Sequence, residues 1–268
     1  MRRASLAMYD MLPPVQAAND SLWQGIASRL EAAGFYAPDA LDRVVSYHDI
    51  WLMPDLLLAQ TCGYPYVTAL RGKVRLVATP AFSFAGGHGT ERVSYVIVRQ
   101  DSPHRDLAAL RGSVVAINEW GSNSGMNLLR AAIAPHAIGG RFFSEVRVTG
   151  GHLPSIAAVQ GGEADVASID TVTWGLLARH APAMLDGVRI LSETPSGPGL
   201  PYITRLDASD AEVGALRAAI AETIADPAYG AAADALGLSG IEILTDADYD
   251  RLDALRREAE RLGYPIIA

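Results

Sequence analysis

Apolar runs alternate with amphipathic stretches along most of the chain. Runs of aliphatic and β-branched residues between turn residues predict strands at 5–8, 43–47, 74–78, 92–99, 114–117 and 164–169. Apolar positions at helical spacing predict helices over 15–33, 56–58, 126–132, 152–160, 213–224, 228–236 and 249–262. Further extended segments are expected at 189–191 and 202–204. Alternation of strand and helix is typical of an α/β fold with a parallel sheet.

Polar turns follow the expected strands in the middle of the chain. Strand 114–117 runs through Asn118 into Ser-Asn-Ser-Gly and a helix, a second helix starts at Gly-Gly-His, and Asp170 ends strand 164–169. A strand end followed by a helix N-terminus directs backbone N–H groups and hydroxyls at one small volume, which suits an anion or a polar ligand. The candidate ligand residues here are Ser122, Asn123, Ser124, Gly125, His152 and Asp170.

Each of these residues also has a structural interpretation. Ser122 or Ser124 alone can be an N-cap, the commonest role of serine before a helix. His152 can be a cap or a packed core histidine, and Asp170 can cap the helix that begins near Thr171. For the Ser-Asn-Ser-Gly cluster as a whole we favour ligand contact, because it combines hydroxyls and backbone N–H groups at one helix start.

The first part of the chain offers its own candidates at strand ends. Tyr9 and Asp10 follow the first expected strand, and Tyr64 and Tyr66 lie in a turn after the 56–58 segment. Aromatic walls with a polar tip suit a cleft that closes over a small molecule. The tyrosines can equally fill the edge of a lobe, and Cys62 is expected to be a small buried filler.

The order of the motifs carries a family resemblance. Asp-Leu-Ala-Ala-Leu-Arg-Gly precedes strand 114–117, followed by Ser-Asn-Ser-Gly, Gly-His and Ala-Val-Gln-Gly-Gly-Glu-Ala-Asp-Val-Ala. This order resembles the phosphate/phosphite/phosphonate-binding family of ABC-transporter solute-binding proteins. The resemblance implies a two-lobed, type II periplasmic-binding-protein fold with two hinge crossovers and a ligand cleft between the lobes. It also implies a small anionic or polar ligand such as phosphate, phosphite or a phosphonate, a transporter permease as partner, and a periplasmic location.

We expect the lobes to divide the chain unequally. Residues 1–99 and 193–268 form the first lobe and residues 100–192 the second, since extended segments near 92–99 and 189–204 flank a contiguous middle rich in strand and helix. The C-terminal helices are expected to pack back onto the first lobe, because few strands accompany them.

Charge and hydropathy exclude several classes of protein. A net charge of −8 without a Lys/Arg run disfavours nucleic-acid binding. No apolar run approaches the ~18 residues of a membrane span, so an integral membrane protein is not expected. The apolar stretch 4–8 is too short for a signal peptide. The sequence read alone is consistent with a cytoplasmic protein if the chain is complete, or with an exported one whose leader has been lost, whereas the resemblance implies the periplasm, and the location stays open.

An enzyme on the same fold is the alternative. The architecture also resembles menaquinone-pathway enzymes that act on chorismate-derived or futalosine-derived substrates, for which Asn118, Ser122, Asn123 and His152 could polarise or deprotonate a substrate. The Gly-x-Ser-x-Gly pattern of a nucleophile elbow is not met, because Asn123 occupies its centre. The histidine spacing predicts no zinc site, and nothing predicts a cofactor. We therefore expect a binding protein without catalytic residues.

Overall fold

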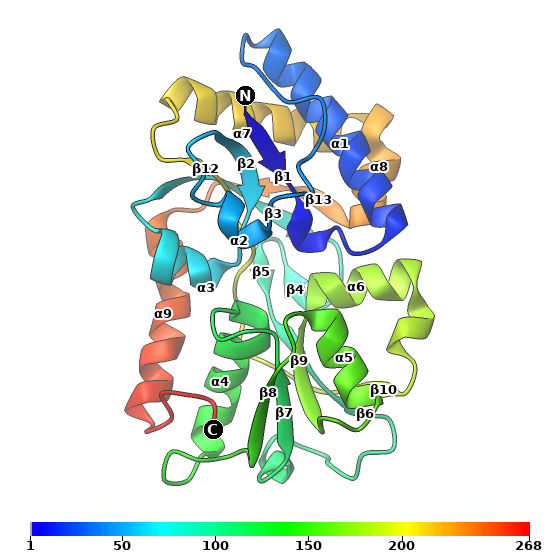
Figure 1. Ribbon diagram of the computed structural model, residues 1–268, viewed down its shortest axis with the longest axis vertical. Coiled ribbons are helices and arrows are strands. Elements are labelled where there is room, and N and C mark those ends of the chain that lie inside the picture. Colours follow the sequence, from blue (N-terminus) through cyan, green and yellow to red (C-terminus); the bar gives the residue numbers. More distant parts are fainter. Residues whose placement is uncertain (1) are drawn as a thin grey trace. The chain divides into compact units, whose positions relative to one another are not determined.

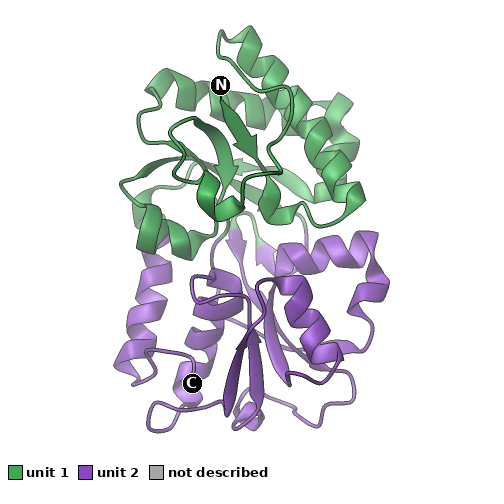
Figure 2. Cartoon of the chain, in the orientation of Figure 1, with its two compact units in different colours: residues 1–83, 88–90, 199–248 green, residues 84–87, 91–198, 249–268 purple. Residues whose placement is uncertain are grey.

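The chain folds into two compact units, each with its own five-stranded sheet (Figure 2). The computed structural model describes residues 2–268. Unit 1 comprises residues 1–83, 88–90 and 199–248, and unit 2 comprises residues 84–87, 91–198 and 249–268. Helices follow strands along both units, so the expected α/β class is confirmed.

The sheet of unit 1 is mixed. Its strands stand in the order β1-β2-β12-β3-β13 (Figure 1). Strands β1 and β2 are parallel, whereas β12 runs antiparallel to β2 and β3, and β13 runs antiparallel to β3. The expectation of a wholly parallel sheet is therefore wrong for the strands that come late in the chain. The bounds are β1 Arg3–Ser5, β2 Leu56–Gln60, β3 Val74–Phe82, β12 Tyr202–Arg205 and β13 Leu238–Glu242.

Helix α1, Pro13–Ala32, packs with α7 and α8 in unit 1. Proline suits the first turn of α1, because an N–H group there has no acceptor within the helix. Gly34 follows the helix end with a φ of 82°, a left-handed conformation that glycine adopts at little cost. Trp23 and Leu30 of α1 are fully buried in the core. The helices and turns of unit 1 are η1 Ala7–Tyr9, α1, α2 Tyr47–Ile50, α3 Gly63–Pro65, η2 Tyr66–Leu70, α7 Asp210–Ala225, η7 Pro227–Tyr229 and α8 Gly230–Leu236.

Strand β2 occupies a segment for which the sequence predicted a helix at 56–58. All its residues are buried, since it lies between β1 and β12 in the sheet. A strand covered on both faces shows no apolar alternation, so its run of leucines has no period that separates strand from helix. The strand expected at 43–47 is also absent, and the one expected at 5–8 lies at Arg3–Ser5, followed by the turn η1.

Unit 2 has the strand order β10-β6-β9-β7-β8. Strand β7 is parallel to both β8 and β9, whereas β6 runs antiparallel to β9 and to β10. The strands are β6 Ser94–Arg99, β7 Val114–Ile117, β8 Glu145–Val148, β9 Val166–Asp170 and β10 Val188–Glu193. The helices and turns are η3 Ala108–Leu110, η4 Asn123–Asn127, α4 Leu128–Ile133, η5 Ala134–His136, α5 His152–Gln160, α6 Thr171–His180 and η6 Pro182–Leu185. The expected strand–turn–helix order of this middle region is confirmed.

Three short strands form a separate small sheet, in the order β11-β5-β4. They are β4 Gly87–His88, β5 Glu91–Arg92 and β11 Gly197–Pro198. The loop around Gly86, Gly87 and Gly89 is therefore a structured connection.

The units differ from the expected lobes in three places, one of which is 193–198, expected in the first lobe but part of unit 2. Strand β6 belongs to unit 2, where it pairs with β9 and β10, although residues 94–99 were expected in the first lobe. Helix α9, Asp246–Arg261, begins in unit 1, but residues 249–268 belong to unit 2. Asn127 of unit 2 donates to the carbonyl of Leu252 in this helix at 3.2 Å. The chain thus passes between the units around 83–91, at 198/199 and, unexpectedly, at 248/249.

Candidate ligand-binding site

The turn after β7 is organised by Ser122. Its hydroxyl oxygen accepts a hydrogen bond from the backbone N–H of Gly125 at 3.0 Å, the N-cap interaction expected of serine here. The π-helical turn η4, Asn123–Asn127, follows, and α4 continues the helix. All residues of η4 are buried. A serine hydroxyl that accepts in this way can still donate its own proton, so Ser122 can cap the helix and donate a hydrogen bond to a ligand at the same time.

Gly125 lies directly against the side chain of Asn118. A Cβ atom at position 125 would stand 2.6 Å from Asn118 Oδ1, far inside van der Waals contact. Asn118 is itself held in place, since its carbonyl accepts from the N–H of Gly150 at 2.8 Å and its Oδ1 from the hydroxyl of Ser155 at 3.4 Å. Glycine at 125 therefore allows the turn to pack onto the end of β7.

Ser124 and His152 come together from two different segments. Ser124 Oγ lies 2.9 Å from His152 Nε2, at the first residue of α5. Ser168 of β9 donates its hydroxyl to the carbonyl of Ser124 at 2.7 Å. The turns that follow β7 and β8 and the neighbouring strand β9 thus meet at this pair, as expected for the carboxyl ends of adjacent parallel strands.

The His152 imidazole is held in its neutral form. Burial lowers the pKa of His152 to about 4, although the charge of Asp170 and the backbone of Ser168 act in the opposite direction. Part of the residue reaches solvent, but its Nδ1 atom is buried and has no hydrogen-bond partner among residues 2–268. A neutral imidazole with its proton on Nε2 donates to Ser124 Oγ and leaves the Ser124 hydroxyl proton free, whereas one with its proton on Nδ1 accepts that hydroxyl proton at Nε2.

Asp170 ends β9 and caps α6. Its Oδ2 accepts hydrogen bonds from the N–H of Thr173 at 2.9 Å and from the Thr173 hydroxyl at 3.2 Å. The carboxylate is buried, and its charge acts on His152. The capping interpretation of Asp170 is therefore confirmed, and the residue also lies within electrostatic reach of the Ser124–His152 pair.

Asn123 belongs to a network that fixes the turn from inside. Its Oδ1 accepts from Asn127 Nδ2 at 3.2 Å, and Asn127 Oδ1 accepts from the guanidinium of Arg130 at 2.5 Å. Asn127 is fully buried and Arg130 is nearly so. The sequence analysis did not single out Asn127 and Arg130, although their spacing from Asn123 places all three side chains on one side of the helix start.

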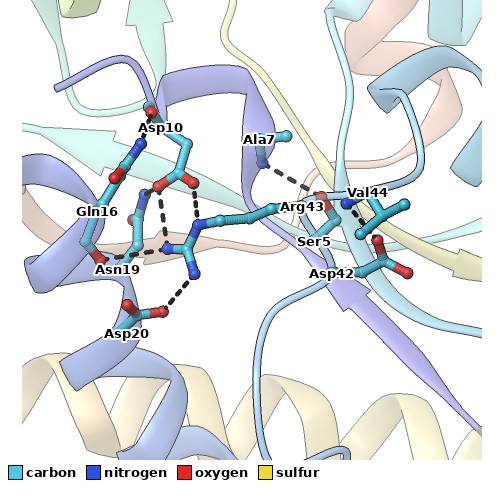
Figure 3. A network of polar contacts seen from close by, with 9 residues as sticks. All are labelled: Ser5, Ala7, Asp10, Gln16, Asn19, Asp20, Asp42, Arg43 and Val44. Carbon is cyan, nitrogen blue, oxygen red and sulfur yellow. Dashed lines mark hydrogen bonds and ion pairs between the residues drawn. The ribbon is translucent and has the colours of Figure 1, made fainter. Parts of the chain in front are cut away.

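In unit 1, Asp10 is engaged by an ion pair (Figure 3). Its Oδ2 accepts from Arg43 Nε at 2.5 Å, and its Oδ1 accepts from Asn19 at 3.0 Å. Arg43 also contacts Asp20 at 2.9 Å. Tyr9 is buried, with its ring edge-on to that of Phe82 at a centroid distance of 6.0 Å. Arg43, expected within a strand, instead lies in a loop and holds Asp10 on the structure of unit 1.

The aromatic turn after β2 is largely buried. The hydroxyl of Tyr66 donates to the carboxylate of Asp246, and Arg71 lies over the Tyr66 ring at 5.9 Å. Burial and the neighbouring Asp246 raise the pKa of Tyr66 above its ordinary range. Tyr64 is also buried. Cys62, expected as a buried filler, is partly exposed, because it stands at the N-cap position of α3.

Within residues 2–268, no group of three or more His, Cys, Asp and Glu side chains is arranged to hold a metal ion. Over the same residues, no helix combines the length and the apolar character needed to cross a membrane.

Solved structures place the fold in the class of two-lobed periplasmic binding proteins. PhnD1 from Prochlorococcus marinus in complex with methylphosphonate aligns with a TM-score of 0.74 at 14% identity, covering 92% of this chain and 94% of that one. A binding protein component of an ABC phosphonate transporter from Pseudomonas aeruginosa gives 0.71 at 17% identity, with 91% and 83% covered. The aliphatic sulphonate binding protein SsuA from Escherichia coli gives 0.56 at 17% identity, with 91% and 89% covered.

The sequence identifies the family within this class. Residues 55–249 match the family described as "ABC transporter, phosphonate, periplasmic substrate-binding protein". The match spans most of the chain, which therefore belongs to this family of substrate-binding proteins. A comparison with curated proteins finds no match.

Proposed function

We propose that this substrate-binding protein captures a phosphorus oxyanion, a phosphonate foremost, through the Ser122–Gly125 turn and His152. The observation that carries the proposal is the 2.9 Å contact between Ser124 Oγ and His152 Nε2 beside a capped helix start. This arrangement aims hydroxyl and backbone N–H donors at one volume without a full positive charge. Oxyanions bind well to such helix starts, because the N–H groups and the helix dipole both favour negative charge.

Phosphate, phosphite and phosphonate share the tetrahedral oxygens that the cradle would bind. The similar structures include a methylphosphonate complex and a sulphonate binding protein. Binding experiments must therefore compare phosphorus oxyanions with sulfur oxyanions. Membership of a phosphonate-binding family supports a phosphorus oxyanion as the ligand.

Tyr9, Tyr64 and Tyr66 remain proposed ligand contacts of unit 1. They follow the carboxyl ends of β1 and β2, the edge at which open α/β sheets bind ligands. Asp10 is a weaker candidate, since Arg43 and Asn19 already occupy its oxygens.

Binding without turnover is the function that the site supports better than catalysis. The Ser124–His152 contact resembles a nucleophile and its base, and this favours an enzyme as the second candidate. Membership of a substrate-binding family weighs against this second candidate. We infer a binding protein that presents its ligand to an ABC-transporter permease, in line with its family.

Titration calorimetry tests this proposal with phosphate, phosphite, methylphosphonate, sulfate and methanesulfonate. We expect binding of at least one phosphorus oxyanion and weaker or no binding of the sulfur analogues. Ser124→Ala should weaken that binding by one to two orders of magnitude, because a charge-assisted hydrogen bond contributes roughly 1.5 to 3 kcal/mol.

Ser144→Ala is the matched control. Ser144 is exposed and donates its hydroxyl to the carbonyl of Ser113, which precedes β7 at the opposite end of the sheet from Ser122. The control should bind as the wild type does. Failure of the wild type to bind any phosphorus oxyanion would refute the proposal. A mass spectrum of the ligand after hours with stoichiometric protein separates binding from catalysis, since an enzyme would change its mass.

A further inference from the structure

Trp120 is the exposed member of the four tryptophans. Trp23 and Trp51 are buried, and their indole N–H groups donate to the carbonyls of Pro38 and Gln60 at 2.9 and 3.0 Å. Trp174 packs edge-on against Tyr95. Trp120, in contrast, is 50% exposed. Burying the free face of this indole against another apolar group would be favourable.

Trp120 belongs to the turn that leads into the oxyanion cradle, the Ser122–Gly125 turn with His152. The N–H of Ser122 donates to the carbonyl of Glu119 at 3.1 Å, so Trp120 is an inner residue of the tight turn that ends at Ser122. Two residues span at most about 7 Å. The Cα atom that carries the indole therefore lies within about 7 Å of the Cα atom of Ser122, a separation that an indole side chain can cover.

Other apolar side chains remain in solvent on the adjoining segment. Val148, at the end of β8, is 52% exposed, and Leu153, next to His152, is partly exposed. This segment runs beside the turn, because the N–H groups of Thr149 and Gly150 donate to the carbonyls of Ile117 and Asn118 at 2.9 and 2.8 Å. The cradle is thus polar at its centre and apolar on two flanking segments.

We infer that Trp120 selects ligands by their organic substituent, because its indole packs on an alkyl or aryl group attached to the bound oxyanion. The inference rests on the proposed oxyanion function and extends it to the remainder of the ligand. Inorganic phosphate has no such group, so the indole adds nothing to its binding. A substituted phosphonate gains contact area with an aromatic face that is otherwise in water.

Calorimetry with three probes tests the inference: inorganic phosphate, methylphosphonate and phenylphosphonate. Trp120→Ala should lower the affinity for phenylphosphonate about tenfold, the effect of removing roughly 50 to 60 Å² of apolar contact. The loss for methylphosphonate should be smaller, and the affinity for phosphate should change less than about twofold. Trp120→Phe should retain most of the preference, because it keeps an aromatic face.

Ile138→Ala is the control, because Ile138 is an exposed apolar residue of unit 2 in a different turn. It should leave all three affinities unchanged. An equal loss for phosphate and phenylphosphonate in Trp120→Ala would overturn the inference, since Trp120 would then only shape the cradle. Unchanged phenylphosphonate binding would overturn it as well. Wild-type protein that binds phosphate but no phosphonate would overturn the inference and leave oxyanion binding intact, whereas binding of none of the probes would remove the proposed function itself.

Discussion

Both units carry polar candidate residues after strand ends, but these residues are engaged differently. In unit 1 the oxygens of Asp10 are occupied by Arg43 and Asn19, and the Tyr66 hydroxyl is occupied by Asp246. In unit 2 hydroxyls, backbone N–H groups and a neutral imidazole surround the Ser124–His152 contact, and the buried carboxylate of Asp170 is held by Thr173. A buried charge requires a counter-charge, whereas a neutral hydroxyl keeps a donor for an incoming ligand. We infer that the charged residues of unit 1 stabilise that unit and that unit 2 supplies the oxyanion contacts.

The comparison also bears on how an acidic chain can bind an anion. With a net charge of −8 the protein as a whole repels anions, and the nearby guanidinium of Arg130 is engaged by Asn127 and by the carbonyl of Pro265. Both acceptors are neutral and leave the charge of Arg130 in place, so attraction comes from the short-range dipoles at the helix start together with this buried guanidinium. Such a site depends on position more than on charge, so small displacements of the turn should matter most.

The largest effect is expected from Gly125→Ala, which displaces the turn itself. The added methyl group would meet Asn118 at 2.6 Å, and Asn118 is held by Gly150 and Ser155. Overpacking of this kind costs up to about 3 kcal/mol, so we expect a loss of that order in unfolding free energy and at least a tenfold loss of oxyanion affinity. Chemical denaturation and calorimetry measure the two.

Gly121→Ala provides the matched control in the same turn. A Cβ atom at position 121 meets nothing within 4 Å. This variant should keep the stability of the wild type. If both glycine variants behave alike, close packing on Asn118 is not what positions the turn.

A second, smaller effect should appear as a dependence of stability on pH. The pKa of His152 is about 4 in the folded chain and near 6.5 when unfolded, so the unfolded state binds more protons between these values. The contribution is fully present above pH 6.5 and is lost as the pH falls toward 4. The full shift corresponds to about 3 kcal/mol, but His152 is partly exposed and solvent screens it, so we expect a loss on the order of 2 kcal/mol in unfolding free energy across this window.

His152→Gln removes the titrating group and should flatten that part of the profile. The two proteins differ at this one position, so the difference between the two profiles isolates His152. Parallel profiles from pH 7 to 4 would show that the imidazole is not held neutral by burial.

The sequence predicted unit 2 better than unit 1 because its signals are local. A serine before a helix, glycines at the ends of α5 and a strand ending in Asp170 each depend on neighbouring residues, and all were found where expected. Strand β2 was missed because burial on both faces removes its apolar period. The sequence showed the helical period of α9, but such a period does not predict which unit the apolar face of the helix will contact.

The side-chain partners of most candidate residues could not be predicted from the sequence. Asp10 meets Arg43 across 33 residues, and Tyr66 meets Asp246 across 180. No periodicity relates residues at such separations. The Ser124–His152 contact spans 28 residues, and although both residues were candidates, their contact was not predicted, because strand β8, which brings His152 beside the turn after β7, was not expected.

The smallest effect tests whether Asp10 serves unit 1 or the ligand. Asp10→Asn removes the charge that faces Arg43 at 2.5 Å, and because the pair is partly exposed we expect a loss of about 1 kcal/mol in unfolding free energy. Oxyanion affinity should stay within about twofold of the wild type. Asp20→Asn is the control: Asp20 contacts the same guanidinium but is 47% exposed at its side chain, so its change should cost less. Urea unfolding and calorimetry on both variants decide the matter. A clear loss of affinity in Asp10→Asn at unchanged stability would make Asp10 a ligand contact and would remove the contrast drawn between the two units.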